Sequence, residues 1–249
     1  GDRLHVLAVA RRLDRLLPSL WQQRVKMNAT TLSYEKWLEV VLGDHPDDPA
    51  WRNLWVPHDL GGLVGRWTEA AAPERFTLLV ADESDRLLLS RTVEQMVGLP
   101  DGMLRPQEAY RDNASIGYGR LEVARMLNER LGDATIDPAL RSRVLRAVKK
   151  YGSWPGEQRV PELPGWARDR VAELSDARAD LVAGLGGRVV GDPDHLRLPP
   201  ADRPVEDAAP AVVPAELAAH AIAVAVEAAA EHQQELRRLR RRLRRRLSL

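Results

Sequence analysis

The first residues that have the means to do chemistry are an arginine and a serine near the start of the chain. Arg11 follows a short apolar run, Leu4 to Ala10, and Ser19 stands eight positions after it. A guanidinium donates two parallel hydrogen bonds to a phosphate, and a hydroxyl adds a third donor. We expect the apolar run to be a strand and Pro18 to start a helix. The spacing then predicts that Arg11 and Ser19 form a phosphate clamp. The alternative is a surface arginine beside a serine at a helix start.

The sequence around these residues resembles a known family. The stretch RRLDRLLPSLWQQRVK is followed by TTLSYEKWLEVV and by WRNLWVPHDLGGLVGRWTEAAAPERFTLLV, and the likeness continues through DNASIGYGRLEVARMLNERLG to RVVGDPDHL. Over about residues 4–198 the chain resembles the sulfotransferase-like proteins of actinobacteria. The resemblance implies an α/β fold of the P-loop type, with a parallel sheet flanked by helices in three layers.

The resemblance also implies an activity, the transfer of a sulfuryl group from 3'-phosphoadenosine-5'-phosphosulfate (PAPS). PAPS would be a co-substrate, the acceptor an unknown hydroxyl or amine, and no metal would be needed. Arg11 and Ser19 would contact the 3'-phosphate of the nucleotide. The alternative from another class is a degenerate, non-catalytic member of this fold that acts as an interaction protein through its C-terminal helix.

The chain lacks a loop that this transfer requires. Backbone N–H groups of a glycine-rich loop, together with Lys or Arg, must hold the 5'-phosphosulfate. The glycine pairs at 61–62 and 186–187 have no adjacent Lys and Ser or Thr. We therefore expect the phosphosulfate loop and the first strand of the sheet to precede this sequence in the intact protein. This chain alone would then be inactive, and no residue in it is assigned as the catalytic base.

Two aromatic or imidazole features are further ligand candidates. His58, in VPHDL, stands at a predicted helix start, where it can meet a ligand. A capping role for the neighbouring Asp59 explains the same local sequence. Trp51 and Trp55 fit the apolar face of a helix, and the alternative is that they line an acceptor pocket.

A polar turn before a predicted helix is the last candidate. Arg111, Asn113 and Ser115 precede the helix that begins near Gly117, and a helix N-terminus with these neighbours can receive an anion. Simple capping by Asn113 or Ser115 is the competing interpretation. The histidines show no paired spacing for a metal, and the chain has no cysteine. The absence of cysteine suits the cytosol. The sequence shows neither a signal peptide nor a long apolar run that would favour export or membrane insertion, so we expect a cytoplasmic protein.

The order of predicted elements favours parallel crossovers. We expect strands at 4–10, 76–81 and 188–191, and helices at 19–27, 34–42, 60–71, 86–97, 118–131, 138–150, 166–185 and 216–247. A strand, helix, strand order at these intervals is typical of a parallel sheet. The predicted domains are an α/β domain over 1–198, a Pro/Ala-rich linker over 199–214 and a helical tail over 215–249.

The net charge is distributed unevenly along the chain. The whole chain carries +1, but eight arginines lie between 237 and 246, so residues 1–236 carry −7. Leucines at 236, 239, 243 and 247 form a stripe through these arginines. This segment has three possible roles. A solvated tail is expected first, and a dimerising or partner helix through 216–247 second. A surface for nucleic acid or anionic membrane is expected least.

Overall fold

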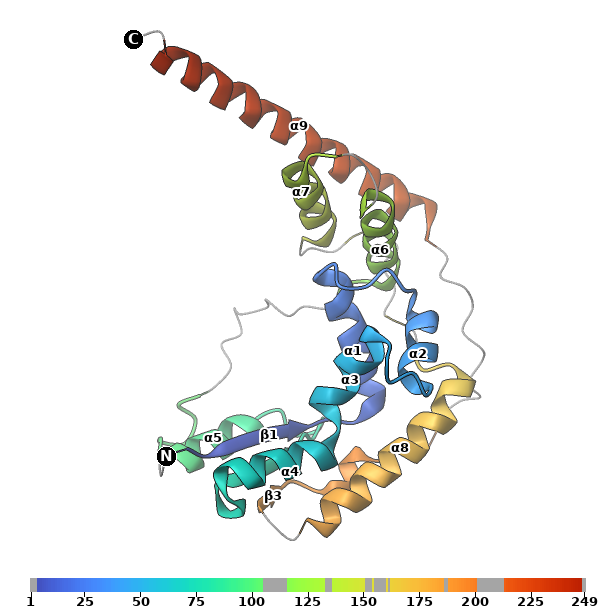
Figure 1. Cartoon of the computed structure of the whole chain (residues 1–249), viewed down its shortest axis with the longest axis vertical. Helices are drawn as coiled ribbons and strands as arrows, with labels where there is room; N and C mark the ends of the chain where they lie inside the picture. Colours follow the sequence, from blue (N-terminus) through green and yellow to red (C-terminus); the bar gives the residue numbers. More distant parts are fainter. Residues whose placement is uncertain are drawn as a thin grey trace. The chain divides into compact units, whose positions relative to one another are not determined.

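The computed structural model confirms the α/β class. It describes residues 4–104, 116–132, 136–150, 154, 160, 162–185, 188–200 and 213–247. Within these residues, helices accompany a parallel sheet of three strands in the order β1-β2-β3 (Figure 1). The strands are β1 (Val6–Ala10), β2 (Phe76–Val80) and β3 (Arg188–Val190). The helices are α1 (Leu13–Lys26), α2 (Tyr34–Leu42), α3 (Pro49–His58), α4 (Leu60–Ala71), α5 (Leu88–Val97), α6 (Tyr118–Gly132), α7 (Pro138–Lys149), α8 (Gly165–Gly184) and α9 (Ala215–Leu247), with short 3-10 helices at Pro73–Arg75 and Pro193–Leu196.

The chain divides into two compact units. Unit 1 consists of Gly1–Ser19, Tyr34–Asp112 and Glu162–Ala208, and it contains the sheet. Unit 2 consists of Leu20–Ser33, Asn113–Pro161 and Ala209–Leu249, and it is helical in its described part. These units rest on spatial contacts, whereas the division of the chain at 198 and 214 stays a prediction from the sequence.

The sheet is the centre of unit 1. Val6 pairs with Phe76 and Ala10 with Val80, while Thr77 pairs with Arg188, and both pairings are parallel. β2 is buried along its whole length, as expected for a central strand of apolar residues. The core formed here joins the sheet to α4, α8 and the turn at Leu196, through Ala10, Leu60, Phe76, Leu78, Val80, Ala179, Val182 and Leu196. In the described residues β1 is an edge strand, and a strand preceding it stays a prediction.

Helix α1 begins earlier than the sequence pattern predicts. The expected start at Pro18 is wrong, because the helix begins at Leu13 and Pro18 lies inside it. Leu13, Leu17, Trp21 and Val25 are all buried and recur at every fourth residue. This buried stripe stabilises the helix through Pro18, although the proline cannot donate the usual backbone hydrogen bond.

The sequence places Trp51 and Trp55 on a helix face but gives that helix no bounds, and it suggests only a polar loop from Asp44 to Ala50, where α3 in fact begins. Asp48 is the N-cap of α3: its carboxylate accepts a hydrogen bond of 2.6 Å from Ala50 N, and Pro49 takes the first helical position. The other expected helices are confirmed within a few residues at each end. Gly98 closes α5 in the left-handed conformation, and Asp137 caps α7.

Unit 2 is organised around the N-terminal half of α9, which packs on α7 and α6. Leu217, Ala221 and Ala228 are buried on that face. A Cβ on Gly119 would lie 3.3 Å from Leu217 Cδ1, so the glycine permits close packing of α6 and α9. On α7, Arg143 donates to Glu235 at 2.5 Å. The residues that follow, 237–243, are all exposed.

Candidate functional site

The carboxyl end of the sheet in unit 1 gathers polar residues from three loops. Arg11 follows β1, Asp82 and Glu83 follow β2, and Gly191 follows β3. Ligands of parallel α/β sheets bind outside the carboxyl ends of the strands. A backbone hydrogen bond of 2.8 Å from Ala81 N to Ala10 O holds the first two loops together at this edge.

Arg11 is the cation nearest to the end of β1 in the sequence, and it is paired with an acid. Its Nε and one terminal nitrogen donate to Glu83 Oε1 at 3.1 and 2.9 Å. The two side chains are 41% and 50% exposed. An ion pair this exposed is worth only about 0–1 kcal/mol, so a ligand with a stronger negative charge can displace Glu83.

Ser19 lies on α1, and its side chain is exposed. It stands six residues after Leu13, the first residue of the helix. At a rise of 1.5 Å per residue this places its Cα about 9 Å along the helix axis from the helix start. Ser19 is therefore part of the second turn and not of the helix start that the sequence suggested. The clamp between Arg11 and Ser19 stays a prediction.

The loop after β2 holds its own acid in place. Asp82 Oδ1 accepts hydrogen bonds from the Ser84 hydroxyl at 2.7 Å and from Ser84 N at 2.8 Å. These hydrogen bonds, with a smaller contribution from His195, lower the pKa of the Asp82 carboxyl. Asp82 is thus a carboxylate at neutral pH, and it lies next to Glu83 in the loop after β2.

The loop after β3 comes very close to β2. Gly191 has a φ of +92°, and a Cβ on it would lie 2.6 Å from the carbonyl oxygen of Val80. Only glycine fits this backbone conformation at this contact. The backbone of β2 and that of the loop after β3 are consequently in direct contact at this end of the sheet.

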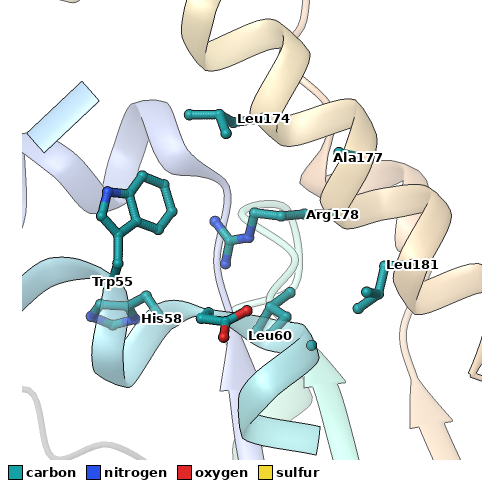
Figure 2. A pocket seen from close by; sticks show the side chains of 9 residues that line it. Trp55, His58, Leu60, Leu174, Ala177, Arg178 and Leu181 are labelled. Carbon is teal, nitrogen blue, oxygen red and sulfur yellow. The ribbon is translucent and has the colours of Figure 1, made fainter. Parts of the chain in front are cut away.

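A separate cavity of about 180 Å³ lies in unit 1 between α8 and the junction of α3 and α4 (Figure 2). Trp55 and His58 line it from α3, and Leu60 from α4. From α8 it is lined by Leu174, Ala177, Arg178 and Leu181. Trp55 on α3 thus lines a pocket together with His58, and the role of that pocket as an acceptor site stays a prediction.

The walls of this cavity are fixed by hydrogen bonds. Trp55 Nε1 donates to the carbonyl oxygen of Val41 at 2.7 Å, and Trp51 Nε1 donates to that of Gly43 at 3.0 Å. The two indole rings lie 6.4 Å apart at an angle of 53°. Because its donor is satisfied, Trp55 presents an apolar ring to the cavity in a fixed position.

Arg178 is the functional candidate that the sequence reasoning missed. Its side chain reaches from α8 toward Trp55 and His58, as Figure 2 shows. Burial lowers the pKa of Arg178 to about 10, so the guanidinium is still charged at neutral pH. In the sequence Arg178 stands between Leu174 and Leu181 at a spacing of four and three residues, but polar Ser175 is also close to it on the helix, so the local pattern does not distinguish Arg178 from a solvated arginine.

His58 is affected by the same surroundings. Burial lowers the pKa of the His58 imidazole, and the positive charge of Arg178 lowers it further. His58 is therefore neutral at pH 7. Arg178 is the only positive charge among the residues that line the cavity in the described part of the chain.

The remaining candidates bring nothing further to either site. Arg111, Asn113 and Ser115 lie outside the described residues. Across the described ranges, no three His, Cys, Asp or Glu residues are grouped so that they could hold a metal ion. No helix in the described part of the chain is both long enough and apolar enough to cross a membrane.

Comparisons of this chain with protein-family models, with curated proteins and with solved structures found no match.

Proposed function

We propose that this chain supplies the 3'-phosphate-binding segment of a PAPS-dependent sulfotransferase. In this proposal the carboxyl end of β1 receives the 3'-phosphate of the nucleotide, with Arg11 as the bidentate donor and Ser19 as the hydroxyl donor. The sulfuryl group would pass to a hydroxyl or amine acceptor in the intact protein. The three-layer P-loop type of fold, with further strands beside β1, is part of the same proposal.

One observation carries the proposal: Arg11 follows the carboxyl end of a parallel strand and is held there by an exposed pair with Glu83. A phosphate monoester carries close to two negative charges at neutral pH, against one for Glu83. It also offers several oxygens to the two donor atoms that Arg11 now directs at one carboxylate oxygen. The exchange of Glu83 for the nucleotide is therefore favourable in both charge and geometry.

Calorimetry with adenosine 3',5'-bisphosphate tests the proposal on the intact protein. We expect the wild type to bind, and Arg11→Ala to lose about 2–4 kcal/mol of binding free energy, because a charge-assisted contact to phosphate is removed. Ser19→Ala should lose about 0.5–1.5 kcal/mol, as for a neutral hydrogen bond. Arg170→Ala is the matched control, since Arg170 also forms an exposed pair with a glutamate, at 3.0 Å from Glu173.

Absence of binding by the intact wild type would overturn the proposal. Equal losses for the Arg11 and Arg170 variants would overturn the assignment of Arg11. The first result would favour the second candidate, a non-catalytic protein that acts through α9. The observation behind that candidate is the exposure of α9 beyond Leu236, where Leu239 and Leu243 are 53% and 58% exposed among arginines.

A further inference from the structure

The cavity beside Arg178 contains a charge without a counter-ion. Arg178 Nε is shielded from solvent and has no hydrogen-bond partner. Within the described residues the guanidinium forms no ion pair at 4 Å or less. Arg178 as a whole is half-buried, and a shielded polar atom such as its Nε costs free energy when it has no partner. A ligand that brings a negative charge to this guanidinium would recover that cost.

Asp59 is the acidic residue among those that line the cavity, but its carboxylate forms no ion pair with Arg178 at 4 Å or less. It stands between α3 and α4, and its carboxylate lies over the first turn of α4. A Cβ on Gly62 would collide with that carboxylate, which shows how closely Asp59 covers the helix start. Asp59 is at the N-cap position of α4, but its side chain forms no capping hydrogen bond, and the residue is exposed. Its carboxylate is therefore open to water and leaves the Arg178 guanidinium without an ion pair.

We propose that this cavity is a binding site for a small organic monoanion, a carboxylate or sulfate ester on a compact apolar body. The anionic head would lie on Arg178, and the body would pack between the Trp55 ring and the leucines of α8. The site is separate from the sheet end, and it stands whether or not Arg11 binds a nucleotide.

The charge of the cavity selects a monoanion. Among the lining residues, Arg178 contributes one positive charge and Asp59 an exposed carboxyl group that is not paired with it, while the neutral His58 contributes no charge near pH 7. A dianion such as a phosphate monoester would leave one negative charge uncompensated in a largely apolar space. The fork of the guanidinium matches the two oxygens of a carboxylate or two oxygens of a sulfate ester.

The size and walls of the cavity select the body of the ligand. A volume of about 180 Å³ is similar to that of the roughly 150 Å³ apolar cavity that is known to bind benzene. This suits a single aromatic ring or a short branched chain. Leu174 and Leu181 lie on α8 to either side of Arg178, and the pinned Trp55 ring faces them (Figure 2). Such walls favour an apolar body and offer few partners to a sugar or a peptide backbone.

Titrations followed by ¹H–¹⁵N NMR of the full chain test this proposal, with benzoate and phenyl sulfate as the probes. For ligands of this size we expect dissociation constants of about 1–10 mM. Benzyl alcohol has the same ring without the charge, and we expect it to bind about tenfold more weakly or less. Phenyl phosphate, measured at pH 8 as the dianion, should also bind more weakly than phenyl sulfate. If only one of the two monoanions binds, that result identifies the head group.

Variants on one helix provide the matched controls. Arg178→Met should weaken benzoate binding about tenfold or more, and Arg178→Lys should weaken it less, because the charge stays but the fork is lost. Arg170→Met removes an arginine of the same helix that pairs with Glu173, and it should leave the affinity unchanged. Ala177→Phe fills the cavity while keeping Arg178, so it should abolish binding even if Arg178→Met does not fold.

Two results would overturn the proposal. One is equal affinity for benzoate and benzyl alcohol in the wild type. The other is an Arg178→Met or Ala177→Phe variant that remains folded, as judged by its NMR spectrum, and binds benzoate as tightly as Arg170→Met does.

Discussion

Three ionisable residues illustrate how surroundings decide chemistry at the scale of single residues. Arg11 is exposed and paired, so its charge is available for exchange with a ligand. Arg178 is shielded at Nε and has no described partner, so its charge is held in place without compensation. His58, beside it, becomes a weaker base through burial and through that same charge. Residue type alone does not distinguish the two arginines. They differ because Arg11 is exposed and paired with an acid, whereas Arg178 has no described partner.

The lowered pKa of His58 predicts a pH-dependent stability. The imidazole binds its proton less well in the folded protein than in the unfolded chain, whose histidine pKa is 6.5. Its contribution to stability is therefore complete above pH 6.5 and is lost as the pH falls. Of the charged groups that face or adjoin His58, Arg178 enhances this effect, and Asp59 is its neighbour in the sequence.

Urea unfolding at pH 7.5 and pH 5.0 measures this contribution. We expect the loss of unfolding free energy between the two pH values to be smaller in His58→Gln than in the wild type. His45→Gln, at an exposed histidine of the same unit, is the control and should retain the wild-type difference. A His58→Gln variant that loses as much stability as the wild type would show that the imidazole titrates normally.

At the scale of elements, apolar spacing and capping residues predicted most of the fold. The three strands, their parallel order and most helices follow from short β-branched runs, from Asp–Pro starts and from glycine ends. α1 and α3 show the limits of this approach. In α1 the buried stripe from Leu13 overrides the usual reading of Pro18 as a helix start. In α3 a capping Asp48 was hidden in a run of polar residues.

The sites were predicted less completely than the elements. Arg11, Trp55 and His58 could be named because their types and neighbours suggest a ligand. Arg178 could not, since a single arginine on a long helix is most often solvated. Its role depends on the packing of α8 against the junction of α3 and α4, and no local pattern in the sequence encodes that contact.

The position of Pro18 predicts a stabilising substitution. A proline inside a helix lacks the N–H that would bond to the carbonyl four residues before it, here that of Asp14. Pro18→Ala should raise the unfolding free energy by about 1–2 kcal/mol, less than the full helix-propensity difference because alanine also frees the unfolded chain. Pro49→Ala is the control, since Pro49 occupies the first position of α3, where proline is well tolerated. Urea denaturation measures the stability of both variants. If Pro18→Ala is no more stable than the wild type, Pro18 does not destabilise α1, as would be expected of a proline in the first turn of a helix.

At the scale of the whole molecule, charge and packing divide α9 into two parts. The first part, to Leu236, carries the acids Glu231 and Glu235 that pair with Arg143 at 3.7 and 2.5 Å, and it buries an apolar face on α6 and α7. The second part holds eight arginines and no acid. Such a segment repels a second copy of itself, so a direct, side-by-side pairing of two tails is disfavoured. A partner with an acidic surface suits it better.

This division predicts that the two parts of α9 can be separated by mutation. Removal of residues 237–249 changes the net charge from +1 to −7, but it deletes no buried side chain among those described, 237–243. The unfolding free energy of this truncated protein should therefore stay within about 0.5 kcal/mol of the wild-type value. Leu217→Ala, in contrast, removes a fully buried side chain between α9 and α6, and it should cost about 2–5 kcal/mol. Thermal and urea unfolding measure both changes.

If the truncation destabilises the protein as much as Leu217→Ala does, the arginines belong to the fold and are not available to a partner. If stability is retained, any binding that disappears with residues 237–249 can be assigned to the arginine-rich segment itself.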